Sequence, residues 1–214
     1  VIEALLAAGN GDSVLVHPGE YPVENEPVEF RWIRDKTVHL SGTGVTPGAT
    51  SLVGFGFGFI DCPGSSVENI KTSASRSSLA TGGDMDFLLR SCIFESNVGG
   101  ITCATVYGSG AWGELLVEDC LFINNTVPPS CAGSEPGAAL SLEGQKGLVR
   151  RCVFVGNESE LGAGIVTSRY ECQITDCLFV ENQGDAGSAI STPGETGGLV
   201  SIDRCTFWRN ETFA

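Results

Sequence analysis

Two carboxylates separated by a single residue are the best candidate for chemistry in this sequence. Asp84 and Asp86 follow the glycine pair at 82–83, and residues two apart on a short strand point to the same side. Two carboxylates with room for water can hold Ca²⁺, so one hypothesis is a calcium site. The other is that both residues belong to a solvated turn after the glycines, which needs no cofactor.

The cysteines are the second group of reactive side chains. There are nine, an odd number that cannot pair completely within one chain. The sequence has no CxxC pair and no HExxH motif, and its only histidines are His17 and His39, so no zinc site is indicated. Cys103 and Cys131 lie outside the repeat described next, and a disulfide between them is one hypothesis.

A six-residue phrase, Cys-x-Phe-x-x-Asn, recurs five times. The fold that this repeat forms determines where the candidate aspartates and cysteines lie. Successive cysteines of the phrase are 28, 32, 25 and 28 residues apart. An aliphatic residue lies three positions before each cysteine, and short apolar stretches with small residues follow the asparagines. The repeated positions are Cys92, Cys120, Cys152, Cys177 and Cys205; Phe94, Phe122, Phe154, Phe179 and Phe207; and Asn97, Asn125, Asn157, Asn182 and Asn210.

A unit of about 28 residues cannot bury its own apolar face, so the units must stack. Stacked coils of short strands predict an all-β fold, a single right-handed parallel β-helix of seven or eight coils over 1–214. The phrase cysteines and phenylalanines then point inward, the cysteines as inert buried thiols, and the asparagines form an amide ladder. Residues 1–12 predict a short amphipathic helix that caps the first coil. We expect the last coil to continue into a longer chain or to dock against another chain.

Charged residues precede each phrase and would form two outward columns. If the coils are in register, oppositely charged neighbours become cross-strand pairs that fix the register. An alternative is that an arginine of these columns, such as Arg90, acts as a catalytic base. The columns are Ser91, Asp119, Arg151, Asp176 and Arg204, and Arg90, Glu118, Arg150, Thr175 and Asp203.

The composition excludes some classes of partner. The chain carries 26 acidic and 12 basic residues, a net charge of −14, which argues against binding to nucleic acid or anionic lipid. The longest apolar stretch, around 51–60, is broken by glycines and shorter than the ~18 residues of a membrane helix. Of three glycosylation sequons, Asn124 is the one expected to be exposed, since Asn157 and Asn210 belong to the inward ladder.

Two resemblances to known families cover nearly the whole chain. The opening at 1–21 resembles the entry to right-handed β-helix proteins of the pectin-lyase-like superfamily. The FxxN phrases are similar to the repeats of polymorphic outer-membrane proteins, with loose versions of their GGA[ILV] motif at 162–165 and 187–190. The second resemblance implies a surface-exposed, often adhesive domain. The first implies a polysaccharide lyase that holds Ca²⁺ through carboxylates such as Asp84 and Asp86, near a base such as Arg90.

Two functional classes therefore remain open. The favoured one is a non-catalytic extracellular or cell-surface module without a cofactor: a structural spacer, an adhesin segment or a filament component. Its partner would be a protein or a carbohydrate at the cell surface. The alternative is a carbohydrate-active enzyme, a lyase, hydrolase or epimerase, for which Ca²⁺ is the implied cofactor.

Overall fold

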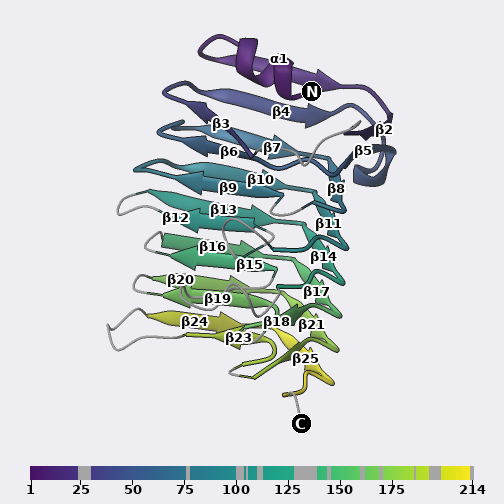
Figure 1. The fold of residues 1–214 in the computed structure, drawn as a ribbon. Helices are drawn as coiled ribbons and strands as arrows, with labels where there is room; N and C mark the ends of the chain where they lie inside the picture. The colour runs from purple at the N-terminus through teal and green to yellow at the C-terminus, as the bar shows by residue number, and fades with distance from the viewer. Residues whose placement is uncertain are drawn as a thin grey trace.

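Short parallel strands alternate with tight corners along the chain. The computed structural model describes residues 1–23, 30–75, 78–99, 104, 106–109, 113–127, 139–143, 146–159, 162–168, 171–185, 187–192 and 199–212. These form a right-handed parallel β-helix with three walls (Figure 1). The prediction of an all-β solenoid is therefore confirmed.

Each wall is one parallel sheet. The first wall contains β1 (Asp12–Val16), β4 (Val38–Gly42), β7 (Ser65–Glu68), β10 (Phe87–Arg90), β13 (Glu114–Glu118), β16 (Lys146–Arg150), β20 (Cys172–Thr175) and β24 (Val200–Asp203). The second wall contains β2 (Gly19–Pro22), β5 (Thr50–Val53), β8 (Lys71–Ser73), β11 (Ile93–Glu95), β14 (Leu121–Ile123), β17 (Val153–Val155), β21 (Leu178–Val180) and β25 (Thr206–Trp208). The third wall contains β3 (Arg31–Arg34), β6 (Phe57–Ile60), β9 (Leu79–Gly82), β12 (Val106–Ser109), β15 (Leu140–Glu143), β19 (Ile165–Ser168) and β23 (Ile190–Ser191).

The remaining elements are small. A fourth, two-stranded sheet joins β18 (Glu158–Ser159) to β22 (Gln183–Gly184), and the 3-10 helix η1 spans Pro47–Ala49. The solenoid makes about six turns, slightly fewer than the seven or eight predicted. Two walls have eight strands, and the third has seven because no third-wall strand follows β25 among the described residues.

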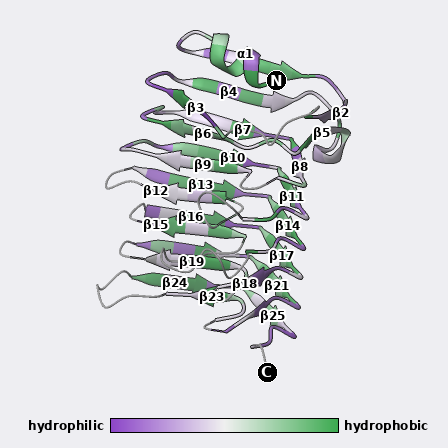
Figure 2. Cartoon of the chain, in the orientation of Figure 1, coloured by the Kyte–Doolittle hydropathy of each residue, from purple (hydrophilic) through white to green (hydrophobic). Residues whose placement is uncertain are grey.

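The coils are in register, so equivalent residues lie directly over one another. Phe94 of β11 is opposite Phe122 of β14, which is opposite Phe154 of β17, and the same register continues to Phe179 of β21. Because side chains alternate between the two sides of a strand, every second residue of each wall points into the coil. Hydrophobic residues accordingly mark the strands in Figure 2, with hydrophilic residues at many of the corners.

The last coil is the exception to this burial. Ile202 and Phe207 occupy inward positions that are fully buried in the preceding coils, yet they are 49% and 46% exposed. Among the described residues no further coil covers them.

Two of the corners are made by single residues with left-handed backbone. In the five phrases one lies before the cysteine and the other before the asparagine, and Asn69 and Ala74 hold the equivalent places in the coil before them. Their φ angles lie between 49° and 61°. Non-glycine residues adopt this conformation at a cost of about 1 kcal/mol, which the stacking of neighbouring coils must offset. The residues are Asn69, Ser91, Asp119, Arg151, Asp176 and Arg204 at the first corner, and Ala74, Ser96, Asn124, Gly156, Glu181 and Arg209 at the second.

The predicted N-terminal cap is a six-residue helix, α1 (Ile2–Ala7), and β1 begins at Asp12. Leu5 of this helix is fully buried against the core. The ammonium group of Lys36 donates to the carbonyl oxygens of Leu5, Leu6 and Ala8 at 3.0, 2.9 and 2.6 Å. These carbonyls lie at the C-terminal end of the helix, where a cation is favourable, so Lys36 fastens the cap to the coil below.

Candidate functional site

The asparagines of the phrase form a buried hydrogen-bonded ladder. The Nδ2 atoms of Asn97, Asn125, Asn157 and Asn182 each donate to Oδ1 of the next asparagine, at 3.0, 2.9, 2.9 and 2.8 Å. Each of these four Nδ2 atoms also donates to a backbone carbonyl oxygen of the preceding coil. Each accepting Oδ1 accepts a second hydrogen bond, from the backbone N–H of the preceding asparagine in the ladder. The side chains of the first four are fully buried. These four amide groups therefore bond both of their hydrogens within the ladder and the backbone and have no donor left for a ligand.

The phenylalanines of the phrase stack as a second ladder. Ring centroids from Phe94 to Phe207 are 5.0, 4.7, 4.9 and 5.0 Å apart, with interplanar angles of 12° or less. Rings at this separation gain contact beyond the burial of area alone, so the stack binds each coil to the next.

The cysteines of the phrase are buried thiols in the four inner coils, while Cys205 of the last coil is partly exposed. Each Sγ donates to the carbonyl oxygen two residues earlier, at 3.2–3.3 Å. Burial raises the pKa of Cys120 well above its ordinary value, and it raises the pKa of Cys172, on the first wall, to about 11. Because the thiolate is the nucleophile, these two groups are inert at neutral pH.

The outward charged columns form a network centred on Glu118. Its carboxylate lies 2.7 Å from Arg150, 3.0 Å from Arg151 and 3.5 Å from Arg90, and Arg151 also binds Asp119 at 2.7 Å. Burial acts to raise the pKa of Glu118, but hydrogen bonds from Arg150 and Arg151 and the charge of Arg90 outweigh it, so the pKa is lowered. The columns link coils, as the cross-strand pairing predicts.

This network makes the stability dependent on pH. The pKa of Glu118 is lower in the folded chain than in the unfolded chain. Its ionised carboxylate therefore contributes fully to stability above the unfolded pKa of about 4.3, and this contribution is lost as the pH falls through the folded pKa. We expect Glu118→Gln to reduce the free energy of unfolding at pH 7 by about 1–3 kcal/mol. The difference from the wild type should shrink below pH 4 in denaturant titrations. A difference that is the same at pH 7 and pH 3 would contradict this role, and Glu181→Gln, in an exposed pair, is the matched control.

The candidate carboxylates Asp84 and Asp86 lie in the turn between β9 and β10, not on a strand as the calcium hypothesis assumed. Both are exposed, and Asp86 Oδ1 accepts the backbone N–H of Glu114 at 2.9 Å. Gly83, with a φ of 88°, turns the chain before them. In the described part of the chain, no three histidine, cysteine, aspartate or glutamate side chains are grouped so that they could hold a metal ion.

The candidate base Arg90 lies between two carboxylates. It is 3.1 Å from Glu68 and 3.5 Å from Glu118, which are outward residues of the neighbouring coils. Because its guanidinium is paired with carboxylates of both neighbouring coils, this geometry favours the structural role of Arg90.

Three other predicted residues have different outcomes. Asn124 is exposed at its corner, where a Cβ at Gly156 would lie 2.4 Å from its Oδ1. Glycine at 156 therefore leaves room for this side chain. Cys103 and Cys131, the proposed disulfide pair, lie outside the described residues.

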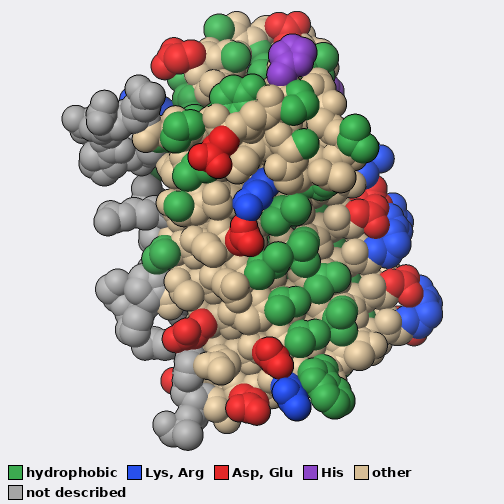
Figure 3. All heavy atoms as spheres, turned by 90° about the vertical axis from the view of Figure 1, so that its right-hand side faces the viewer, with side chains coloured by type: hydrophobic (Ala, Val, Ile, Leu, Met, Phe, Trp, Pro, Cys, Tyr) green, Lys and Arg blue, Asp and Glu red, His purple; other side chains and the backbone are tan. Residues whose placement is uncertain are grey.

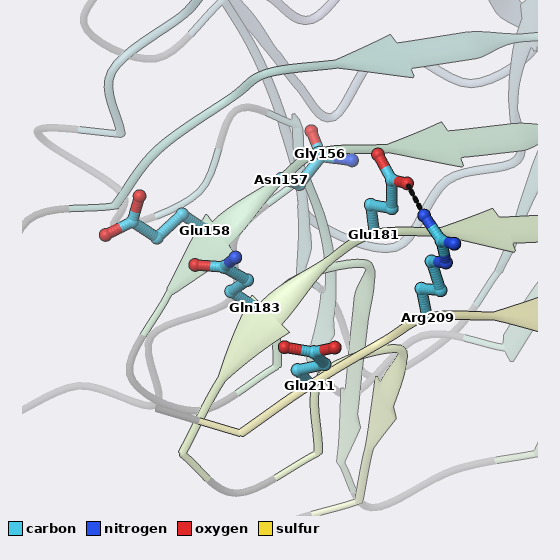
Figure 4. Close-up of a pocket in the computed structure, with 7 residues that line it drawn as sticks. All are labelled: Gly156, Asn157, Glu158, Glu181, Gln183, Arg209 and Glu211. Atoms are coloured by element: carbon cyan, nitrogen blue, oxygen red, sulfur yellow. Dashed lines mark ion pairs between the residues drawn. The ribbon is translucent and has the colours of Figure 1, made fainter. Parts of the chain in front are cut away.

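An acidic cavity of about 430 Å³ lies near the end of the second wall. Figure 4 shows Glu181 and Arg209 facing one another on one side, with Glu158, Gln183 and Glu211 on the other. The Arg209 guanidinium is 3.6 Å from Glu181, so its charge is already matched. No sequence motif predicts this cavity, because its residues come from β18, β22 and the corners of three coils.

The second wall carries an apolar outer surface that sequence reasoning missed. Its members are outward-facing residues of the five consecutive strands from β11 to β25. They form two columns of four residues each, Ile93, Leu121, Val153 and Leu178, and Ile123, Val155, Val180 and Trp208. Figure 3 looks onto this wall and shows the hydrophobic side chains as a continuous band. We call these eight residues the aliphatic band. The signal was present in the sequence, since the residue between the cysteine and phenylalanine is aliphatic in four of five phrases.

Comparisons with protein-family models, with curated proteins and with solved structures found no match to this chain. No helix of the described residues is long and apolar enough to cross a membrane.

Proposed function

We propose that this chain is a non-catalytic extracellular or cell-surface module that serves as a stiff spacer, an adhesin segment or a filament component. The observation that carries the proposal is that three ladders run through consecutive coils: paired amides, stacked rings and matched charges. Each ladder binds a coil to its neighbours, which is what a rigid rod requires.

The side chains with catalytic potential support the same proposal. The ladder thiols Cys120 and Cys152 are buried, and Arg90 and Arg150 are paired with carboxylates. General acid–base catalysis needs a titratable group within reach of the substrate. Here these groups are engaged between coils.

The surface location rests on the sequence. The FxxN phrases resemble repeats of polymorphic outer-membrane proteins, and Asn124 offers an exposed sequon on a corner. Antibody labelling of intact cells, compared with permeabilised cells, tests this part of the proposal. Labelling only after permeabilisation would contradict it.

One observation favours the alternative, a carbohydrate-active enzyme of the pectin-lyase-like kind. An open cavity of about 360 Å³ on the first wall is lined by Asp86, Glu114, Ser65 and aliphatic residues. It places two carboxylates beside apolar surface, although Glu114 is paired with Lys146 at 3.0 Å.

A polysaccharide screen separates the two functions. We expect no cleavage of acidic or neutral polysaccharides with or without Ca²⁺, followed by ultraviolet absorbance of unsaturated products and by reducing ends. The matched variants are Asp84→Ala/Asp86→Ala and, at the acidic cavity, Glu158→Ala/Glu211→Ala. Cleavage that disappears in the first variant and persists in the second would overturn the non-catalytic proposal in favour of the enzyme.

A further inference from the structure

The aliphatic band is not a requirement of the fold. Outward positions of the preceding coils on the same wall hold Glu20, Ser51 and Lys71. Outward positions at the end of the first wall's strands hold the charged residues of the Glu118 network. The coil therefore tolerates polar residues at such positions, and the band's composition needs another explanation.

The band spans five rows of the second wall, and charged residues adjoin it only in its first and last rows. Its first row pairs Ile93 with Glu95, and its last row pairs Thr206 with Trp208. Glu95 forms an ion pair with Lys71 of the preceding coil. At the other end, the Arg209 guanidinium lies 5.5 Å from the centre of the Trp208 ring. One end thus presents a carboxylate and the other a cation over an indole.

We propose that the band is a self-association surface on which two copies of this chain pack face to face in antiparallel orientation. Two sheets with apolar faces pack about 10 Å apart. In an antiparallel pair centred on the Val153–Val155 row, the Glu95 row of one copy lies opposite the Trp208 row of the other. Glu95 then meets the region of Arg209.

The charges of Glu95 and Arg209 favour the antiparallel orientation over the parallel one. A parallel face-to-face pair would place Glu95 over Ile93 of the other copy and bury the Glu95–Lys71 ion pair against an apolar side chain. Desolvating an ion pair without adding a partner is costly, whereas the antiparallel pair brings each Glu95 a second cation, Arg209 of the other copy, whose own pair with Glu181 is exposed and 3.6 Å long. Electrostatic complementarity of this kind fixes orientation more than affinity.

The pair should be weak and should strengthen with salt. Five rows of two residues are at or below the lower end of the areas seen in specific interfaces. Each copy also carries a net charge of −14, so long-range repulsion opposes association and is screened as ionic strength rises.

Sedimentation velocity over a concentration series, at low and high ionic strength, tests the proposal. We expect a reversible dimer whose population increases with salt, and about tenfold or greater weakening in Val155→Lys. Leu116→Lys is the matched control, because Leu116 is an outward, half-buried aliphatic residue of the first wall; it should leave association unchanged. Val155→Ser, with circular dichroism and thermal unfolding, guards against a folding defect in the lysine variant and should also weaken association.

A charge exchange tests the orientation. Glu95→Arg and Arg209→Glu should each weaken association, and the double variant should restore it. A chain that stays monomeric in all conditions, or a dimer that Val155→Lys and Val155→Ser leave intact, would overturn the proposal. A double variant that remains as weak as the single ones would overturn the antiparallel arrangement. None of these outcomes bears on catalysis, which the polysaccharide screen tests separately.

Discussion

Replacing Phe154 by alanine should reduce the free energy of unfolding by about 3–5 kcal/mol. The ring is fully buried and lies between Phe122 and Phe179, with centroid distances of 4.7 and 4.9 Å. Its removal leaves a cavity in the middle of the stack and loses a ring contact on each side. The measurement is the shift of the denaturant midpoint, with Phe154→Leu as a milder variant should the alanine variant not fold.

Phe207 is the matched control for this experiment. It has the same place in the phrase and stacks on Phe179 at 5.0 Å, but it is 46% exposed and, within the described part of the chain, stacks on a ring on one side only. We expect Phe207→Ala to cost about 1 kcal/mol. Equal losses at positions 154 and 207 would show that the stack does not transmit stability between coils.

The second large effect is expected from Asn157→Ala, a loss of about 3–5 kcal/mol. Asn157 donates to the Phe122 carbonyl and to Asn182 Oδ1, and its own Oδ1 receives both the backbone N–H and the amide of Asn125. Alanine removes all four bonds at a site with no exposure to water, leaving buried partners unpaired. Equilibrium unfolding in urea measures the loss.

An aspartate at the same position separates hydrogen bonding from packing. Asn157→Asp has nearly the same shape, but a buried carboxylate cannot donate to its neighbours, and its folded pKa should be raised. A raised pKa means that stability is lost as the pH rises through it, so the difference from the wild type should be smaller at pH 4 than at pH 7. A difference independent of pH would contradict the ladder's role, and the exposed neighbour variant Asn124→Asp should behave like the wild type.

The repeat was sufficient to predict the fold because every level of the structure depends on the same spacing. The phrase at 152–157, for example, supplies an inward thiol, an inward ring and a ladder amide, and each finds its equivalent one coil away. Side chains alternate between the two sides of a strand, and this alternation predicts which residues point inward. Opposite charges at equivalent positions of neighbouring coils, such as Glu118 and Arg150, predict the ion pairs.

The corners were not predictable from the sequence. Arg151, Glu181 and Arg209 have left-handed backbone, which residues of these types seldom adopt. The neighbouring coils impose it, since a chain that turns between two walls within one residue must do so at every level. The intrinsic backbone preferences of these residue types therefore do not indicate the left-handed conformation.

The candidate sites were harder to predict for a related reason. Asp84 and Asp86 were expected on one strand, but Gly83 places them in the turn before β10. The acidic cavity combines Glu158 with Glu211, which are more than 50 positions apart in the sequence. Only the stacking of three coils brings them to one place.

The register of the coils has a further consequence for how such a chain folds. The amide partners of the ladder lie 25–32 residues apart at every level, and this separation stays constant however many coils the chain has. The entropy lost in closing each loop is therefore the same at every step. Folding can begin at any adjacent pair of coils and propagate in both directions. A chain of this design could gain or lose a whole coil in evolution without changing the difficulty of folding, whereas the loss of a few residues from within one coil would shift the register of a wall.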